Sequence, residues 1–291
     1  MRAIRLKNQR LRLVAGLLVA AAIGVAAGFL TTRTASSGEH AAAGLPRTSD
    51  YHSLLVSPND PAHLILGTHE GLFGSSDEGR TWRKVSLPGR DAMTLARPTQ
   101  KAIWVAGHDV LAKSTDSGVT WVDVRPDGLP SLDIHGFAVD RGHPGRLYAA
   151  IAGEGLYRSR NNGSSFRLVS QEVGGAVFAL GVLPDGRIFA GDLKRGLLVS
   201  RDDGRTWRLS LPEQLAGLAV DSRQPNRLLA TGRGIFLSQN GGRSWRRVFA
   251  VSEGVGPVAW SPSRPDLAYA VGFDRTLYRS NDGGRSWRAV S

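Results

Sequence analysis

A short motif that recurs six times limits the folds open to this chain more than any other feature of its sequence. The motif follows the pattern S-x-D-x-G-x-(S/T)-W. Its copies begin at Ser75, Ser114, Ser159, Ser200, Ser238 and Ser280. The third and fifth copies carry asparagine in place of aspartate, and the third ends in phenylalanine. Successive copies start 39, 45, 41, 38 and 42 residues apart, as β-propeller blades do, so the sequence predicts six blades.

Each period has room for four short strands. In the first period the strands are expected at 53–56, 64–67, 72–75 and 82–85, and in the third at 137–139, 147–150, 156–159 and 166–168. The 36 glycines and 14 prolines suit tight turns between strands. An all-β, six-bladed propeller over residues 51–291 is therefore predicted. Because one strand follows the last motif, blade six is expected to use its own four strands, without an interlocking N-terminal strand.

The motif has a structural explanation as the turn between the third and fourth strands of a blade. Glycine supplies a positive φ, the aspartate and hydroxyl side chains bond nearby backbone N–H groups, and the closing ring packs into the apolar layer. Five of the seven tryptophans close a copy: Trp82, Trp121, Trp207, Trp245 and Trp287. We expect these five in the core and not in a ligand site.

These motifs resemble the Asp box, or bacterial neuraminidase repeat, of sialidase-like, sortilin-type and photosystem II assembly factor propellers. The resemblance covers about residues 51–291 and implies the propeller fold. It leaves the function open, because the same blades serve enzymes, receptors and assembly factors.

Residues 13–30 carry no charge and predict a membrane-spanning helix. As a helix they would rise ~27 Å, close to the hydrocarbon thickness of a bilayer. Five cations precede them within residues 1–12 and only Arg33 follows closely, which places the N-terminus in the cytoplasm and the propeller outside the cell membrane. The alternative is a signal peptide cleaved near Ala27 or Ala43. Residues 31–50 are small and polar, and a flexible linker without chemistry is expected there.

The charge and the absence of cysteine narrow the classes of partner. The formal net charge of +12 admits anionic partners such as lipid headgroups or acidic glycans, although five of these charges lie in residues 1–12. Nucleic acid is not expected, because the arginines recur at fixed repeat positions and form no single basic stripe. Without cysteine the chain has neither disulfides nor thiolate metal sites. We expect a monomer.

The resemblance to sialidases implies three arginines that grip a carboxylate and a tyrosine nucleophile. The candidate ligand-binding residues are Arg195, Arg233, Arg275 and Tyr51. The three arginines occupy comparable loops in blades four to six and could attract an anion, with ordinary loop charge as the alternative. A glycosidase would take its catalytic acid from Asp133, Asp192 or Asp274, although Tyr51 has no obvious carboxylate partner and the arginine-isoleucine-proline motif of sialidases is absent.

Aligning the blades selects four of the seven histidines: His52, His69, His108 and His135. His52 and His135 stand at the start of the innermost strand in blades one and three. The other two stand where the second strand ends in blades one and two. Antiparallel order brings these positions to one rim, opposite the Asp boxes. His63 and His143 fall on the other face.

Imidazoles on one rim suggest a metal site. Together with Glu70, Asp109 or Asp133 they would suit zinc, copper or nickel, with an open position for water or substrate. Protonated, the same set could bind an anion. The plainer alternative is that each histidine satisfies its own turn.

The sequence thus favours a membrane-tethered, extracytoplasmic propeller that serves as a binding or assembly scaffold for a protein or an anionic glycan. Its histidine-bearing face is the expected metal or anion site. The alternative is a sialidase-like exo-glycoside hydrolase.

Overall fold

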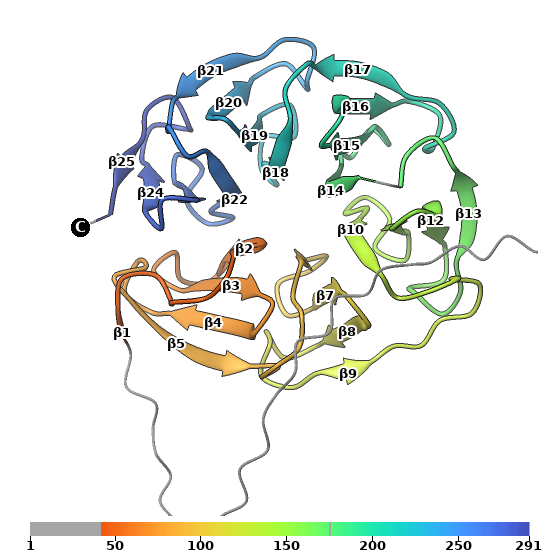
Figure 1. Cartoon of the computed structure of the whole chain (residues 1–291), viewed down its shortest axis with the longest axis horizontal. Helices are drawn as coiled ribbons and strands as arrows, with labels where there is room; N and C mark the ends of the chain where they lie inside the picture. Colours follow the sequence, from red (N-terminus) through yellow and green to blue (C-terminus); the bar gives the residue numbers. More distant parts are fainter. Residues whose placement is uncertain (1–41, 175, 291) are drawn as a thin grey trace, which may run out of the picture. The chain divides into compact units, whose positions relative to one another are not determined.

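The computed structural model describes residues 42–174 and 176–290, and these residues form six antiparallel sheets arranged around a central axis (Figure 1). Each sheet is one blade, and apart from β1, which pairs with β5, every strand within a blade pairs with the next in sequence. The predicted all-β, six-bladed propeller is confirmed for this part of the chain. The strand positions expected for blades one and three lie within three residues of the observed ones.

Blades one to three come first along the chain. Blade one contains β1 (Ala42–Ala43), β2 (Ser53–Val56), β3 (Leu64–Thr68), β4 (Gly71–Ser75) and β5 (Thr81–Ser86). Blade two contains β6 (Thr94–Ala96), β7 (Ile103–Gly107), β8 (Val110–Ser114) and β9 (Val122–Asp123). Blade three contains β10 (Ile134–Val139), β11 (Leu147–Ile151), β12 (Gly155–Ser159) and β13 (Arg167–Ser170).

Blades four to six complete the ring. Blade four contains β14 (Val177–Val182), β15 (Ile188–Asp192), β16 (Gly196–Ser200) and β17 (Arg208–Leu211). Blade five contains β18 (Leu215–Val220), β19 (Leu228–Gly232), β20 (Ile235–Ser238) and β21 (Arg246–Phe249). Blade six contains β22 (Val255–Trp260), β23 (Ala268–Gly272), β24 (Leu277–Ser280) and β25 (Arg288–Ala289). The innermost strands β2, β6, β10, β14, β18 and β22 surround the axis (Figure 1).

The ring closes as expected, but residues 42–50, expected to belong to a linker, also contact blade one. Blade six is built from its own four strands, and β1 pairs with β5 on the outer edge of blade one. Gly44 donates its N–H to Arg80, and the Tyr51 hydroxyl donates to the carbonyl of Pro46 at 2.7 Å. The end of the expected linker is therefore part of the folded unit, because its backbone is hydrogen-bonded to blade one.

The Asp box forms the turn that its residues predicted. In blade one the Ser75 hydroxyl donates to Asp77 at 2.8 Å and accepts the N–H of Gly79 at 2.8 Å. The Asp77 carboxylate accepts the N–H and the hydroxyl of Thr81 at 2.9 and 2.6 Å. Gly79 has a φ of 87°, and a side chain there would collide with Leu277 of blade six. The box therefore fixes the turn and lets neighbouring blades approach closely.

The core lies within the blades and between them. The second strands are almost wholly buried, and Trp82 of blade one packs in a cluster with Tyr269 and Leu277 of blade six. Trp82, Trp207 and Trp287 are buried as expected, whereas Trp121 and Trp245 are only half-buried against their clusters. Apolar packing of adjacent blades closes the ring, since no disulfide is available.

The predicted membrane-spanning helix at 13–30 lies outside the described residues. Within 42–174 and 176–290 there is no helix with the length and apolarity to cross a bilayer.

Candidate functional site

The four rim histidines converge, as their repeat positions suggested. His52 precedes β2, His69 follows β3, His108 follows β7, and His135 lies on β10, so three consecutive blades supply them. The rings of His52 and His69 meet edge to face with centroids 4.3 Å apart. Those of His69 and His108 are stacked at 5.7 Å, and those of His108 and His135 meet edge to face at 5.2 Å. The result is a continuous row of imidazoles.

Three aspartates lie along this row and divide it into overlapping groups. We call the seven side chains the histidine row: Asp50, His52, His69, Asp91, His108, Asp133 and His135. Each group consists of two histidines and one aspartate. One potential ligand atom from each of the three residues lies within 4.8 Å of the other two. Two-histidine, one-carboxylate sets are donor sets that bind divalent transition ions in proteins.

The first group is formed by blade one alone. His52 Nε2 lies 3.1 Å from His69 Nδ1 and 3.0 Å from Asp50 Oδ1. The second oxygen of Asp50 lies 2.5 Å from His69 Nδ1. Blade one therefore brings two imidazole nitrogens and a carboxylate within hydrogen-bonding distance of one another.

The last group joins blades two and three. His108 Nε2 lies 3.2 Å from His135 Nε2 and 3.4 Å from Asp133 Oδ1, and His135 Nε2 lies 3.1 Å from the same oxygen. An isolated antiparallel β-bridge between His108 and Asp133 pairs the backbone after β7 with the backbone before β10. The three donor atoms form a nearly equilateral triangle.

Asp91 lies between these two groups and contacts both. Its side chain is only 8 % exposed, in the link between β5 and β6. Asp91 Oδ2 lies 2.6 Å from His108 Nδ1 and accepts the N–H of His108 at 3.0 Å, while Oδ1 lies 3.8 Å from His69 Nε2. Asp91 thus faces the ring nitrogens of His69 and His108 that the outer groups do not use.

The hydrogen bonding of the row is incomplete. One oxygen each of Asp50, Asp91 and Asp133 and the Nδ1 atom of His135 are buried without a hydrogen-bond partner. Asp50 Oδ1 and Asp133 Oδ1 still lie 3.0 and 3.1 Å from imidazole nitrogens, so the atoms without a close partner are Asp91 Oδ1 and His135 Nδ1. Buried polar atoms are normally paired, and these two are consistent with a further group at the row. Burial lowers the pKa of His52 by more than Asp50 raises it, which favours the neutral, metal-binding imidazole.

Sequence reasoning missed two of the three aspartates. Asp50 and Asp91 belong to the row, whereas Glu70 and Asp109 are exposed in adjacent turns and belong to none of the three groups. A signal was present in the repeat register: Asp50 and Asp133 each stand two residues before an aligned histidine, and Asp91 stands two residues before Met93. The missing histidine in blade two concealed the pattern.

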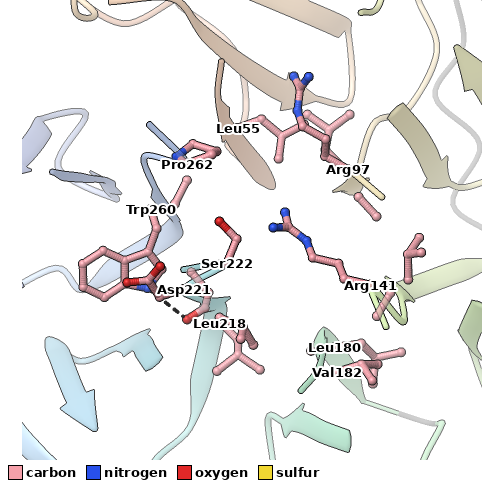
Figure 2. A pocket seen from close by; sticks show the side chains of 18 of the residues that line it. Leu55, Arg97, Arg141, Leu180, Val182, Leu218, Asp221, Ser222, Trp260 and Pro262 are labelled. Carbon is pink, nitrogen blue, oxygen red and sulfur yellow. Dashed lines mark hydrogen bonds between the residues drawn. The ribbon is translucent and has the colours of Figure 1, made fainter. Parts of the chain in front are cut away.

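A separate cavity lies at the ends of the innermost strands that are opposite the histidine row. It has a volume of about 200 Å³ and is lined mainly by apolar residues where these strands end. Figure 2 shows Arg141 extending into it, near Ser222. Arg97 also lines the cavity, and burial together with the charge of Arg141 lowers the pKa of Arg97 to about 10. Neither arginine is in an ion pair among the described residues, and the Asp221 carboxylate that also lines the cavity pairs with Arg227.

The four residues expected to bind a ligand are engaged separately. Arg195 pairs with Asp192 at 3.0 Å, the carbonyl of Arg233 accepts from Arg247, and the Arg275 side chain donates to the carbonyl of Thr48 at 3.4 Å. Tyr51 is a core residue, with its hydroxyl bonded to Pro46. Burial raises its pKa more than the charge of Arg275 lowers it, the opposite of what an activated nucleophile needs. Arg195, Arg275 and Tyr51 thus make side-chain contacts within the protein, whereas the contact at Arg233 is to its backbone carbonyl, and ligand binding by these four residues stays a prediction.

The aspartates proposed as catalytic acids have structural partners too. Burial alone would raise the pKa of Asp192, but hydrogen bonds from the N–H groups of Lys194 and Arg195 hold it below its usual range. Asp274 accepts the hydroxyl of Tyr278 at 2.6 Å. A general acid at neutral pH needs a raised pKa, which Asp192 lacks.

Comparison with protein families gives a match over residues 46–291 to the family described as Photosynthesis system II assembly factor YCF48. The chain belongs to this family. A search of curated proteins finds no match. The Asp-box repeats and the six sheets are consistent with this membership.

Solved structures of similar fold include both assembly factors and enzymes. YCF48 bound to a D1 peptide is 20 % identical with a TM-score of 0.54, over 86 % of this chain and 84 % of that one. YCF48 from Cyanidioschyzon merolae is 18 % identical with a TM-score of 0.54, over 85 % and 87 %. The GH74 xyloglucanase from Xanthomonas campestris is 18 % identical with a TM-score of 0.62 over 86 % of this chain, which spans only 46 % of that enzyme. At these identities the likeness shows the fold alone.

Proposed function

We propose that this chain is a membrane-tethered scaffold that holds a divalent transition metal in the histidine row and uses that face to bind a protein partner outside the cytoplasm. The convergence of four imidazoles and three carboxylates, several with orphaned atoms, carries the proposal. With neutral imidazoles the row has three negative charges close together, and a divalent cation would offset their repulsion.

The choice of a transition ion follows from the donor atoms. Nitrogen and carboxylate ligands suit zinc, copper or nickel, whereas calcium and magnesium prefer oxygen alone. Each group supplies three protein ligands, so a four-coordinate ion would keep one position for water or for a group from a partner. The partly exposed His69 and the exposed His108 make that position accessible from solvent.

A protein partner is supported by the family. One solved relative is YCF48 bound to a D1 peptide. A histidine, aspartate or glutamate side chain of a bound peptide could take the open position on the metal. Metal and peptide would then bind cooperatively.

The proposed location rests on residues 1–30, where five cations precede an uncharged segment. Extraction of membranes with alkaline carbonate should leave the chain in the pellet, and protease added outside intact spheroplasts should digest the propeller. Release by carbonate, or protection from the protease, would contradict the tether or its orientation.

The experiment for the metal is elemental analysis of the purified full-length chain after exposure to zinc and dialysis. The test variant replaces the four rim histidines with alanine, and the control variant is His63→Ala/His143→Ala. The control histidines pair with Asp60 and Asp140 in turns on the other face. Bound zinc in the wild type and the control, but not in the four-histidine variant, supports the proposal. Equal zinc in all three, or none in any, overturns it.

The second candidate, a glycoside hydrolase, is favoured only by the fold-level likeness to GH74 enzymes. The engagement of Tyr51 and Asp192 in structural contacts argues against a sialidase mechanism. Hydrolysis of aryl glycosides that is lost on replacing Asp133, Asp192 or Asp274 would favour the enzyme over the scaffold.

A further inference from the structure

Resting on the metal site of the proposed function, we propose further that the histidine row binds two ions, one in each outer group, with Asp91 holding the rings between them. The first ion is assigned to His52 Nε2, His69 Nδ1 and Asp50, and the second to His108 Nε2, His135 Nε2 and Asp133.

The spacing of the donor atoms supports this assignment. Two ligand atoms about 2.1 Å from a tetrahedral ion lie about 3.4 Å apart. The second group has edges of 3.2, 3.4 and 3.1 Å. In the first group the two nitrogens lie 3.1 Å apart, but the Asp50 oxygens lie 3.0 Å from His52 Nε2 and 2.5 Å from His69 Nδ1, so this carboxylate must move outward to admit an ion. Small movements of side chains would complete both sites.

The number of ions depends on which ring nitrogens of the two inner histidines, His69 and His108, are free to bind a metal. A neutral imidazole offers one nitrogen to a metal and carries its proton on the other. If His69 uses Nδ1 and His108 uses Nε2 for the outer ions, their remaining nitrogens both face Asp91. Carboxylates that accept the distal N–H of a ligating histidine fix its tautomer and orientation.

The arrangement of the rings agrees with a paired site. The two inner rings are stacked nearly parallel, with an interplanar angle of 7°, while each is nearly perpendicular to its outer neighbour, at 84° and 88°. The row is therefore two similar halves related across Asp91. Asp91 is buried between these halves and has one unpaired oxygen. We therefore assign it the role of orienting the inner histidine of each half.

A single central ion on His69, Asp91 and His108 is the competing arrangement, because these residues also form a group. It would leave Asp50 and Asp133 without a role. Asp91 would then be a ligand, and its replacement would abolish binding.

The test is a zinc titration of the full-length chain by calorimetry, with bound zinc counted by elemental analysis. Two zinc ions are expected in the wild type and one each in the variants Asp50→Asn/His52→Ala and Asp133→Asn/His135→Ala. Asp91→Asn should keep two ions with affinity lower by about 10- to 100-fold. Circular dichroism checks that each variant is folded.

The outcomes separate this inference from the proposed function. One zinc ion in the wild type, lost in Asp91→Asn or in the four-histidine variant, overturns the two-ion arrangement and leaves the metal-binding scaffold standing. No zinc in the wild type overturns both. If Asp91→Asn does not fold, the zinc count of the wild type still decides, two ions against one, because each outer double variant keeps one ion under either arrangement.

Discussion

The aspartates on the two faces of the propeller differ in how completely their oxygens are hydrogen-bonded. On the Asp-box face both oxygens of Asp77 accept hydrogen bonds from within the same turn. On the histidine face Asp50, Asp91 and Asp133 each keep one buried oxygen without a hydrogen bond. A satisfied turn needs nothing further to be stable, whereas an unsatisfied cluster would be stabilised by a group that completes its hydrogen bonds or coordinates its atoms.

The two faces also differ in charge. The histidine row gathers carboxylates and imidazole nitrogens, the donor atoms that bind transition-metal cations. The cavity at the opposite end of the innermost strands gathers Arg97 and Arg141, which attract anions. The repeat therefore fixes the fold, and substitutions at equivalent strand ends give each face its own chemistry.

The largest expected effect is stabilisation by zinc through the histidine face. A ligand at 100 times its Kd raises the free energy of unfolding by about 2.7 kcal/mol per site. For a domain of this size that corresponds to a rise in Tm of about 5–10 °C. Differential scanning fluorimetry should show this rise in the wild type and not in the four-histidine variant. A similar rise in that variant would place the zinc elsewhere.

The next effect separates structural from functional polar groups. Ser200→Ala removes a buried hydroxyl that bonds Asp202 and the N–H of Gly204, and should cost about 1–3 kcal/mol. His69→Ala, at a partly exposed side chain, should change the stability in chelator by less than about 0.5 kcal/mol. Urea unfolding measures both. A larger loss for His69→Ala would make the row a structural element.

A smaller effect is expected on the folding stability at acidic pH. Hydrogen bonds from the hydroxyl and N–H of Thr206 lower the pKa of Asp202 to about 2, below the usual value of 3.8. The carboxylate's contribution is thus complete above about pH 4 and is lost as the pH falls toward 2. Asp202→Asn should be nearly neutral at pH 7, since Asn240 makes equivalent bonds in blade five, and should lessen the loss of stability in acid.

Urea unfolding at pH 7 and pH 2.5 measures this difference. The reverse substitution, Asn240→Asp, is the matched control and should increase the sensitivity to acid. Equal acid sensitivity of all three proteins would contradict the role assigned to the box carboxylate.

The smallest effect is expected at the arginine-lined cavity. Sulfate should raise the Tm of the wild type more than that of Arg141→Gln, by about 2 °C or less, because an exposed charge contributes little in water. Arg208→Gln, an exposed arginine on the outer strand β17, is the control. Equal sulfate responses of the wild type and Arg141→Gln would show that the cavity has no preference for anions.

The fold could be predicted because its signal is local. Each Asp box contains the hydrogen-bonding groups of its own turn, so the six blades follow from six short segments. The common rim of His52, His69, His108 and His135 followed from antiparallel order alone. Asp50 and Asp91 were missed because one fell in an expected linker and the other in a blade link, and only packing brings them to the histidines. The meeting of Arg97 and Arg141 depends on how strand ends converge on the axis.

The most direct test of the account is a crystal structure of the zinc-loaded protein with anomalous diffraction measured on both sides of the zinc absorption edge. The account predicts zinc peaks within the histidine row, one beside His52 and His69 and one beside His108 and His135. Zinc bound only at other surfaces, or a histidine row without anomalous density at saturating zinc, would contradict it.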